Sequence, residues 1–309
     1  MSSSVLVTGG NGLIGNALKK ILPDAIYITR KDGDFTDICQ VKKIFKKVRP
    51  VTVFHLAAKV AGVKTNAEKN AEMLAVNVQI NTNVLSMARE FGVQKLVTLL
   101  STCAFRERPE NPPSEKDVHV GMPYAGNLGY GSAKRLLDLQ IGLLKQQYGC
   151  NFTSITPATV FGPFDNWDIN DGHVMAALIH KCYLAKRNNE PFHIWGSGAA
   201  VRQFIFSYDV AHILFEVLKN YNDSETLIVS PMEGISIREL VEMITQVMDF
   251  KGPVIYDQTK PEGAAARLLN NAKFKTLFPN FKFTPLKDAL QTTVQWFVEN
   301  YSNARGIIA

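Results

Sequence analysis

Tyr130 and Lys134 lie four residues apart in the stretch GYGSAK, which begins at Gly129 and opens a long amphipathic segment. On a helix this spacing places both side chains on one face. A phenol has an ordinary pKa of about 10, and an ammonium group beside it, with a second cation nearby, would lower that pKa. Tyr130 could then exchange a proton with a carbonyl or hydroxyl group of a substrate. The same spacing also occurs on solvated helix faces, so the choice between a catalytic pair and a solvated face depends on the rest of the sequence.

A second group of reactive side chains follows a predicted strand over residues 95–100. Ser101 can donate a hydrogen bond to a substrate oxygen, and Cys103 can act as a base if a neighbouring cation lowers the pKa of its thiol. Ligands of open α/β sheets bind beyond the carboxyl ends of the strands, which is where these residues fall. A strand-ending serine and a buried, inert cysteine are the plain alternatives.

A glycine-rich turn between a strand over 5–8 and a helix predicts a dinucleotide site. The first glycine permits a tight turn, the second lets a pyrophosphate approach the backbone, and the third lets the helix pack closely on the sheet. The start of that helix supplies amide donors to phosphate. A purely structural turn is the alternative. The predicted cofactor contacts of this turn are Gly9, Asn11, Gly12, Leu13, Ile14 and Gly15.

The second strand, over 25–29, ends in Arg30 and Lys31, where cofactor selectivity is decided. An acidic residue there would bind the ribose hydroxyls of NAD, whereas a cation accommodates the 2′-phosphate of NADP. NADP(H) is therefore the predicted cofactor, and Asp32 and Asp34 keep NAD open as the alternative.

Strands and helices alternate through the first half of the chain, which is typical of a parallel sheet covered on both faces. Strands are predicted over 51–56 and 150–156 and helices over 37–47 and 74–91. After an inserted region, a helix over 209–218 and a strand over 226–229 return to the sheet. We predict an α/β fold: a Rossmann-type doubly wound parallel sheet, formed by residues 1–163 and 207–232, with a smaller α+β substrate-binding domain, formed by residues 164–206 and 233–309.

Composition excludes several classes of protein. With 309 residues, 46% hydrophobic and 20% charged, the chain is predicted to be globular, and no apolar run reaches the roughly 20 residues of a membrane helix. It begins without a signal-peptide pattern, so a cytoplasmic protein is expected. The four cysteines lack metal-ligand spacing, and we expect four thiols and no metal. The charge of +6 is dispersed, which argues against nucleic acid and suits a small anionic substrate.

Taken together, these features resemble the extended short-chain dehydrogenase/reductase family, in particular its members that act on nucleotide sugars. The similarity spans nearly the whole chain. It rests on HLAAK from His55, STC from Ser101, Tyr130 with Lys134, VFGPFDN from Val160, DGHV from Asp171, IHK from Ile179, WGSG from Trp195 and RQF from Arg202.

The resemblance implies a site in which GDP-4-keto-6-deoxy-D-mannose is epimerised at C3 and C5 and then reduced at C4 by NADPH. By similarity, Cys103 removes the sugar protons and His173 returns them, while Ser101 and Tyr130 bind the enolate oxygen. Tyr130, supported by Lys134, then protonates the alkoxide. A histidine considered alone is more often structural, and only the presence of the other motif residues favours the catalytic role of His173.

The same resemblance implies further contacts. The nicotinamide half of the cofactor would be bordered by Lys134, Pro157, Val160 and His173, and the substrate would be bound by Lys181, Trp195, Arg202, Glu262 and Arg267. A homodimer through helices over 74–91 and 136–148 is also implied.

Two departures and three alternatives accompany this interpretation. Ala176 stands where the family usually has proline, and the segment 105–122 diverges. A related 4-ketoreductase with one or no epimerisation is one alternative, and an enzyme for a different ketosugar nucleotide is another. A non-catalytic NADP-binding sensor is less favoured, because it has no need of Ser101, Tyr130 and Lys134 together.

Overall fold

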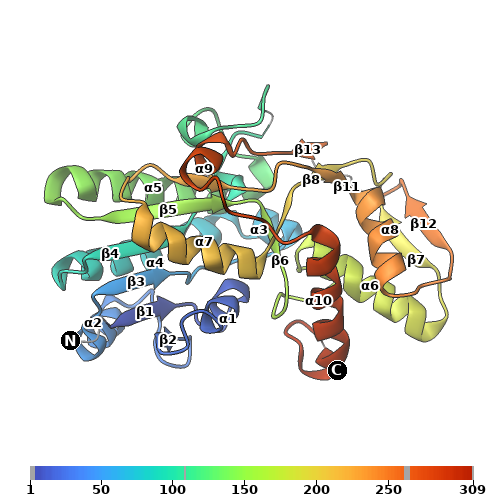
Figure 1. Cartoon of the computed structure of the whole chain (residues 1–309), viewed down its shortest axis with the longest axis horizontal. Helices are drawn as coiled ribbons and strands as arrows, with labels where there is room; N and C mark the ends of the chain where they lie inside the picture. The colour runs from blue at the N-terminus through green and yellow to red at the C-terminus, as the bar shows by residue number, and fades with distance from the viewer. Residues whose placement is uncertain (1–3, 108, 261–264, 308–309) are drawn as a thin grey trace.

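A six-stranded parallel sheet forms the larger part of the computed structural model, which describes residues 4–107, 109–260 and 265–307 (Figure 1). The strand order is β10-β5-β4-β3-β1-β2, and every neighbouring pair is parallel. The strands are β1 (Val5–Thr8), β2 (Ile26–Ile28), β3 (Thr52–His55), β4 (Lys95–Leu99), β5 (Phe152–Pro157) and β10 (Leu227–Val229).

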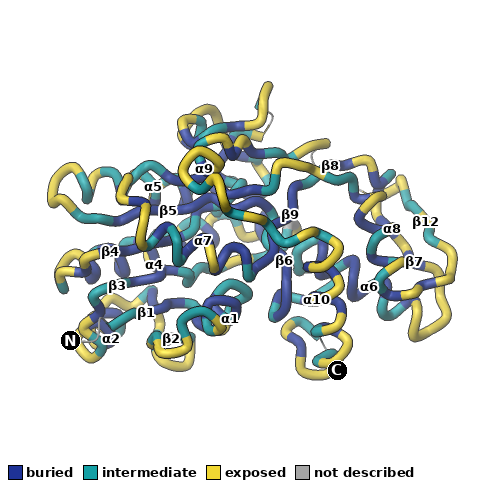
Figure 2. The backbone as a smooth tube through the Cα atoms, viewed as in Figure 1, coloured by how far each residue is buried: buried dark blue, intermediate teal, exposed yellow. Residues whose placement is uncertain are grey.

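Both faces of this sheet are buried, because helices cover each of them. Successive side chains of a strand point to opposite faces, so neighbouring residues join different hydrophobic clusters. Leu6 belongs to one hydrophobic cluster and its neighbour Val7 to another. One cluster includes residues of α2 (Ile38–Val48), α4 (Asn70–Glu90) and α5 (Leu128–Tyr148), and the other includes residues of α1 (Leu13–Lys19), α7 (Ser207–Asn220) and α9 (Ala272–Leu277). The inner strands are correspondingly mostly dark blue in Figure 2, between helices with exposed outer faces, whereas the edge strand β2 is intermediate to exposed.

The direction of the chain across the sheet reverses at β1, because β2 lies on one side of it and β3 on the other. In sheets of this type, ligands bind beyond the carboxyl ends of the strands at such a reversal. Thr8, His55, Leu99 and Pro157 end four of the central strands at that edge. The topology therefore brings the glycine turn and the serine and cysteine after β4 to the same edge.

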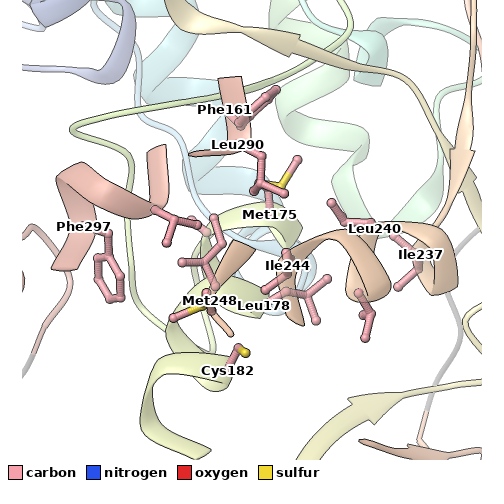
Figure 3. Close-up of a cluster of buried hydrophobic side chains, with 14 of the residues drawn as sticks. Phe161, Met175, Leu178, Cys182, Ile237, Leu240, Ile244, Met248, Leu290 and Phe297 are labelled. Carbon is pink, nitrogen blue, oxygen red and sulfur yellow. The ribbon is translucent and has the colours of Figure 1, made fainter. Parts of the chain in front are cut away.

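Smaller sheets and three helices form the other part of the molecule. The paired strands are β6 (Thr159–Phe161) with β9 (Phe204–Phe206), β7 (Phe192–Trp195) with β12 (Val254–Asp257), and β8 (Val201–Arg202) with β11 (Ile235–Ser236) and β13 (Ala266–Arg267). A third hydrophobic cluster joins α6 (Val174–Asn188), α8 (Ile237–Val247) and α10 (Leu286–Glu299). Met175, Ile244 and Leu290 meet in it (Figure 3), so the start of α6 is firmly anchored.

The predicted α/β architecture, with its parallel sheet and its smaller mixed sheets, is confirmed. The helix expected over 74–91 begins earlier, at Asn70, and is preceded by the short α3 (Val63–Glu68), because polar residues hide its first turns from a hydrophobic pattern. The two-domain division stays a prediction. Within the stretch assigned to the second domain, α9 packs on the sheet, where Phe274 joins the cluster of Val7. No described helix has the length and hydropathy of a membrane-spanning segment.

Candidate active site

The segment after β4 carries Ser101 and Cys103 on one tight turn. Ser101 caps the 3-10 helix η1 (Thr102–Ala104), and its hydroxyl oxygen accepts a hydrogen bond of 3.2 Å from the backbone amide of Cys103. The Ser101 side chain is also near enough to the phenol of Tyr130 to act on its pKa, which it lowers. The serine therefore lies between the cysteine and the tyrosine.

Two nitrogen donors surround the sulfur of Cys103. Nδ2 of Asn127 donates to Sγ at 2.9 Å, and Nη1 of Arg267 lies 4.0 Å from the same atom. Asn127 is buried at the end of the 3-10 helix η3 (Ala125–Asn127), immediately before α5. Sequence reasoning missed Asn127, although its position three residues before Tyr130 was a usable signal. Arg267, predicted to bind substrate, lies beside the thiol.

Glycines on both sides of Tyr130 allow α5 to approach the rest of the site. A Cβ atom on Gly129 would lie 1.9 Å from the carbonyl oxygen of Asn70, and one on Gly131 would lie 2.3 Å from the carbonyl oxygen of Cys103. The amide of Gly129 also donates to Oδ1 of Asn70 at 2.8 Å. The first turn of α5 is therefore pressed against the cysteine turn with no room for a side chain between them.

Lys134 is buried, with 4% of its surface exposed, and points toward β4. Its ammonium group donates to the carbonyl oxygen of Leu99 at 2.8 Å and lies 5.6 Å from the centre of the Tyr130 ring. Burial lowers the pKa of Lys134 to about 8, although a negative charge on Cys103 would raise it. The lysine and the tyrosine share one helical face, as their spacing predicted.

The pKa of Tyr130 is raised, whereas the sequence-based expectation was that nearby cations would lower it. Burial is the main cause, and the negative charge of a Cys103 thiolate adds to it, while the hydrogen bond from Ser101 acts in the opposite direction. The ammonium of Lys134 lies over the ring and donates to Leu99. Tyr130 is therefore a neutral phenol at neutral pH, which makes it a proton donor.

His55 holds the ends of β1 and β3 together behind the lysine. Its Nδ1 lies 2.9 Å from Oγ1 of Thr8, and its Nε2 lies 3.1 Å from Oδ1 of Asn81. Burial and the charge of Lys134 lower the pKa of His55 to about 3, so the ring is neutral. Sequence reasoning noted the HLAAK motif but not this buried network.

The turn between β1 and α1 requires glycine at two of its three predicted glycine positions. Gly9 has a φ of +72°, and a Cβ atom on Gly15 would lie 2.5 Å from the carbonyl oxygen of Gly9, so both positions require glycine. A Cβ atom on Gly12 would meet only that oxygen, at 3.3 Å, and its freedom from packing leaves room for a ligand. Asn11 is exposed, and Leu13 and Ile14 are half-buried.

Arg30 is exposed beyond the end of β2, in the position predicted to distinguish NADP from NAD. The carboxylate of Asp32 turns back and accepts hydrogen bonds from the amide and hydroxyl of Thr29, at 2.8 and 2.7 Å. These bonds lower the pKa of Asp32. Asp34, the other acidic residue that kept NAD open, accepts a hydrogen bond of 2.8 Å from the amide of Thr36, so both carboxylates are engaged by their own loop.

Pro157 and Val160 flank the point where the chain leaves the main sheet. Pro157 ends β5 and is buried, and Val160 lies in β6 and is half-buried. Pro157 is at the carboxyl edge of the main sheet and Val160 follows it in β6, and their contact with the nicotinamide stays a prediction.

His173 stands at the N-cap position of α6. Its Nδ1 lies 3.1 Å from Oδ1 of Asp165, which is 2% exposed. The carboxylate of Asp165 is the main cause of a raised pKa at His173. Sequence reasoning placed Asp165 in a polar turn and did not connect it with the histidine.

A short stretch of chain connects the histidine to the tyrosine. The amide of Gly62 donates to Oδ1 of Asp171 at 2.8 Å, two residues before His173. Eight residues further on, Nδ2 of Asn70 donates to the carbonyl oxygen of Ala125 at 3.1 Å. The segment 62–70 therefore bridges the loop before α6 and the start of α5.

The predicted substrate residues form two cationic groups. Lys181 Nζ lies 4.5 Å from the centre of the Trp195 ring, which is half exposed. Arg202 and Arg267 are partners in the register of β8 and β13, and burial together with the charge of Arg267 lowers the pKa of Arg202 to about 10. Among the described residues, neither arginine forms a salt bridge. Glu262 lies outside the described residues.

Comparison with known proteins places this site in a family. The chain matches the NAD dependent epimerase/dehydratase family over residues 5–229. It is 40% identical to the GDP-L-fucose synthase of Dictyostelium discoideum over 311 residues, covering 98% of this chain and 97% of that protein. A crystal structure of a GDP-L-fucose synthetase from Naegleria fowleri bound to NADP has a TM-score of 0.94 and 37% identity, covering 98% of this chain and 95% of that one. The chain therefore belongs to the NAD dependent epimerase/dehydratase family.

Proposed function

We propose that the protein is a GDP-L-fucose synthase, which converts GDP-4-keto-6-deoxy-D-mannose to GDP-L-fucose by epimerisation at C3 and C5 and NADPH-dependent reduction at C4. The observation that carries the proposal is a full-length match to GDP-L-fucose synthases in a chain that has a thiol, an imidazole and a phenol suited to these steps.

Epimerisation needs a base and an acid. The ketone at C4 acidifies the hydrogens on C3 and C5, so a base can remove each proton and an acid on the opposite face of the sugar can return it. Cys103 is the proposed base, because its sulfur lies at the turn after β4 with hydrogen-bond donors of Asn127 and Arg267 around it. His173 is the proposed acid, because Asp165 favours its protonated form.

Ser101 and Tyr130 are proposed to stabilise the charge that develops on the oxygen at C4. Their side chains lie close to each other, and hydroxyl groups held in place in this way act as oxyanion donors without reorganising. In the reductive step Tyr130 gives its proton to the same oxygen. The ammonium group of Lys134 lies over the tyrosine ring and stays protonated below its pKa of about 8.

NADPH is the proposed cofactor, and it supplies the hydride that reduces C4. The open face of Gly12 would accept its phosphates, and the exposed guanidinium of Arg30 would meet the 2′-phosphate. Asn11, Leu13, Ile14, Pro157 and Val160 would border it.

The two cationic groups are proposed to bind the nucleotide half of the substrate. Arg202 and Arg267 lie side by side without acidic partners among the described residues, so their mutual repulsion is relieved when an anion binds between them. A diphosphate has that charge. Trp195, with Lys181 over its ring, offers a flat surface for the base.

We also propose a homodimer through α4 and α5. A shallow apolar groove of about 500 Å³ lies between these helices, lined by Leu74, Val78 and Leu136 among others. Leu139 and Leu143 of α5 are 49% and 52% exposed on the same face. Exposed apolar area of this kind marks an interface. The four free cysteines suit the reducing cytoplasm as the proposed location.

The test is incubation of the purified protein with NADPH and either the guanosine or the uridine diphosphate ketosugar, in heavy water. We expect NADPH oxidation with the guanosine substrate and deuterium at both C3 and C5 of the product by NMR. Label at one position only would reduce the proposal to a single epimerisation. No turnover of the guanosine ketosugar would reject it.

Two variants test whether the proposed base and the proposed acid carry out the proton transfers. We expect Cys103→Ser and His173→Gln to lose most deuterium incorporation and to retain NADPH binding, because proton transfer by a positioned side chain contributes about 10²–10⁴-fold. Cys150→Ser is the matched control, since Cys150 lies before β5, away from the carboxyl edge.

A further inference from the structure

We infer that Asp165 is a positioning residue of this site, which holds His173 by Nδ1 so that Nε2 carries the proton transferred to the sugar. This inference rests on the proposed function. It starts from one contact, the distance of 3.1 Å between Nδ1 of His173 and Oδ1 of Asp165. No other described residue is as close a charge partner for the imidazole.

The carboxylate of Asp165 is buried in contact with the imidazole of His173. Asp165 is 2% exposed, and its Oδ1 also accepts a hydrogen bond of 2.7 Å from the backbone amide of Asn166. Its Oδ2 is buried with no hydrogen-bond partner among the described residues. A buried carboxylate costs several kcal/mol unless a cation compensates it. The protonated imidazole of His173 is the group in contact that can do so.

The backbone around Asp165 is built to hold this position. Phe164, immediately before it, has a φ of +68°, a left-handed conformation that bulky residues rarely adopt. The Phe164 ring packs 4.5 Å from the ring of Trp296 in α10, which secures the turn. Strain of about 1–3 kcal/mol is kept in proteins where surrounding contacts over-determine the conformation, often at functional sites.

The other end of the loop is equally constrained. A Cβ atom on Gly172, next to His173, would lie 2.4 Å from the carbonyl oxygen of Asn166. The amide of Trp167, whose side chain is fully buried, donates to the carbonyl oxygen of Arg305 at 2.8 Å. The aspartate and the histidine are thus eight residues apart in sequence but fixed to each other by one rigid loop.

A positive charge on His173 is unfavourable at the start of a helix. The residue occupies the N-cap of α6, where the helix dipole disfavours a cation. The charged groups that face it are Asp165 and Asp171, which raise its pKa, and Arg305 from the C-terminal segment, which lowers it. Asp165 is the largest of these influences, and the pKa of His173 is raised although burial and Arg305 lower it. If His173 only stabilised the start of α6, a neutral N-cap residue would serve better than a protonated histidine. The position of Asp165 beside His173 therefore favours a role in proton donation.

The ring nitrogens then have separate tasks. Because Nδ1–H is bound to the carboxylate, the proton that leaves the imidazolium is the one on Nε2. Loss of that proton leaves a neutral ring whose Nδ1–H stays on Asp165, so the ring keeps its orientation between the two inversions. Reprotonation from solvent restores the acid.

The experiment is Asp165→Asn in the full chain, with histidine NMR titration and the pH dependence of deuterium incorporation at C3 and C5 as readouts. Asparagine keeps an acceptor for Nδ1–H but removes the charge. We expect the titration midpoint of His173 to move to lower pH and epimerisation to fall by about 10-fold or more, with a loss that grows as the pH rises. Substrate KM and NADPH binding should be unchanged.

Asp168→Asn is the matched control. Asp168 belongs to the same loop and accepts hydrogen bonds from the amides of Asn170 and Asp171, at 2.7 and 2.8 Å, without contacting His173. It should leave the His173 midpoint in place. The His173 signal among the six histidines is assigned with His173→Gln.

An unchanged His173 midpoint in Asp165→Asn would overturn the inference, whatever the activity of the variant. If that variant does not fold, the wild-type protein decides: a His173 midpoint at or below the ordinary value of about 6.5 is contrary to the inference, and one above it is in favour. Failure of the proposed function is recognised separately, since wild-type protein would then convert no ketosugar while the titration still reports on Asp165.

Discussion

Replacing Gly131 with alanine tests whether close contact between α5 and the cysteine turn sets the activity. The added Cβ atom would lie 2.3 Å from the carbonyl oxygen of Cys103 and 3.0 Å from Cβ of Pro123. Cβ atoms are essentially never found closer than 3.0 Å to a non-bonded heavy atom, so the helix and the turn must separate by about 0.7 Å. The atom that must give way is backbone, which cannot rotate aside.

Two effects follow from that separation. Overpacking of this kind costs about 1–3 kcal/mol of stability, against the roughly 0.5–1 kcal/mol that alanine gains over glycine within a helix. The shift also moves Tyr130 away from Ser101 and Asn127 away from the sulfur of Cys103. Because misplacement of reacting groups by 1 Å can cost about 10²-fold, we expect kcat to fall by about 10- to 100-fold.

Gly142→Ala is the control on the same helix, since nothing lies within 4 Å of the added Cβ atom. It should stabilise the protein by about 0.5–1 kcal/mol and leave kcat unchanged. Urea unfolding and the assay of GDP-L-fucose formation measure both variants. Full activity in Gly131→Ala, with stability equal to that of Gly142→Ala, would refute the reasoning that this contact positions the site.

Three further predictions concern the lysine, the phenol and the dimer. Since the folded-state pKa of Lys134 is lowered from 10.5 to about 8, the unfolded chain binds more protons in that interval and wild-type stability rises with pH there. The buried charge of Lys134 costs about 3 kcal/mol at neutral pH, and the hydrogen bond to Leu99 offsets part of that cost. Lys134→Met should therefore be about 1–2 kcal/mol more stable than wild type in urea unfolding and should lose that advantage near pH 10.5. The variant should also lose reduction, and the exposed Lys46→Met is its control. Tyr130→Phe should abolish NADPH oxidation while calorimetry shows unchanged NADPH binding; normal turnover would reject the role of the phenol. Leu139→Glu should yield monomers in light scattering, unlike Leu277→Glu on α9, whose leucine is 46% exposed, and a dimeric Leu139→Glu would exclude this face.

The sequence predicted those parts of the fold that depend on local pattern. The alternation of strands and helices, the strand–glycine turn–helix unit and the shared face of Tyr130 and Lys134 follow from spacings of two and of about four residues, and these spacings are visible in the chain. The start of α4 was misplaced because Asn70 and Glu72 give no hydrophobic signal.

Contacts between distant segments could not be predicted in this way. The pair of Asp165 and His173 depends on a left-handed residue at Phe164, which no pattern of hydrophobicity reports. The approach of Arg267 to Cys103 joins segments 164 residues apart. The raised pKa of Tyr130 depends on how deeply α5 is buried against the turn after β4, and this depth is set by Gly129 and Gly131 together with tertiary packing.

The side chains around Cys103 and His173, the two proposed proton-transfer groups, differ in a way that suits a separate role for each of them. The sulfur of Cys103 has two nitrogen donors beside it, the amide of Asn127 and the guanidinium of Arg267. His173 is surrounded by carboxylates, of which Asp165 is nearest, and these favour a positive ring. The proposed base therefore lies among hydrogen-bond donors and the proposed acid lies among carboxylates, an arrangement that suits the proposed direction of proton transfer. We expect that exchanging the two environments, with a carboxylate near the sulfur and a cation near the ring, would abolish both inversions.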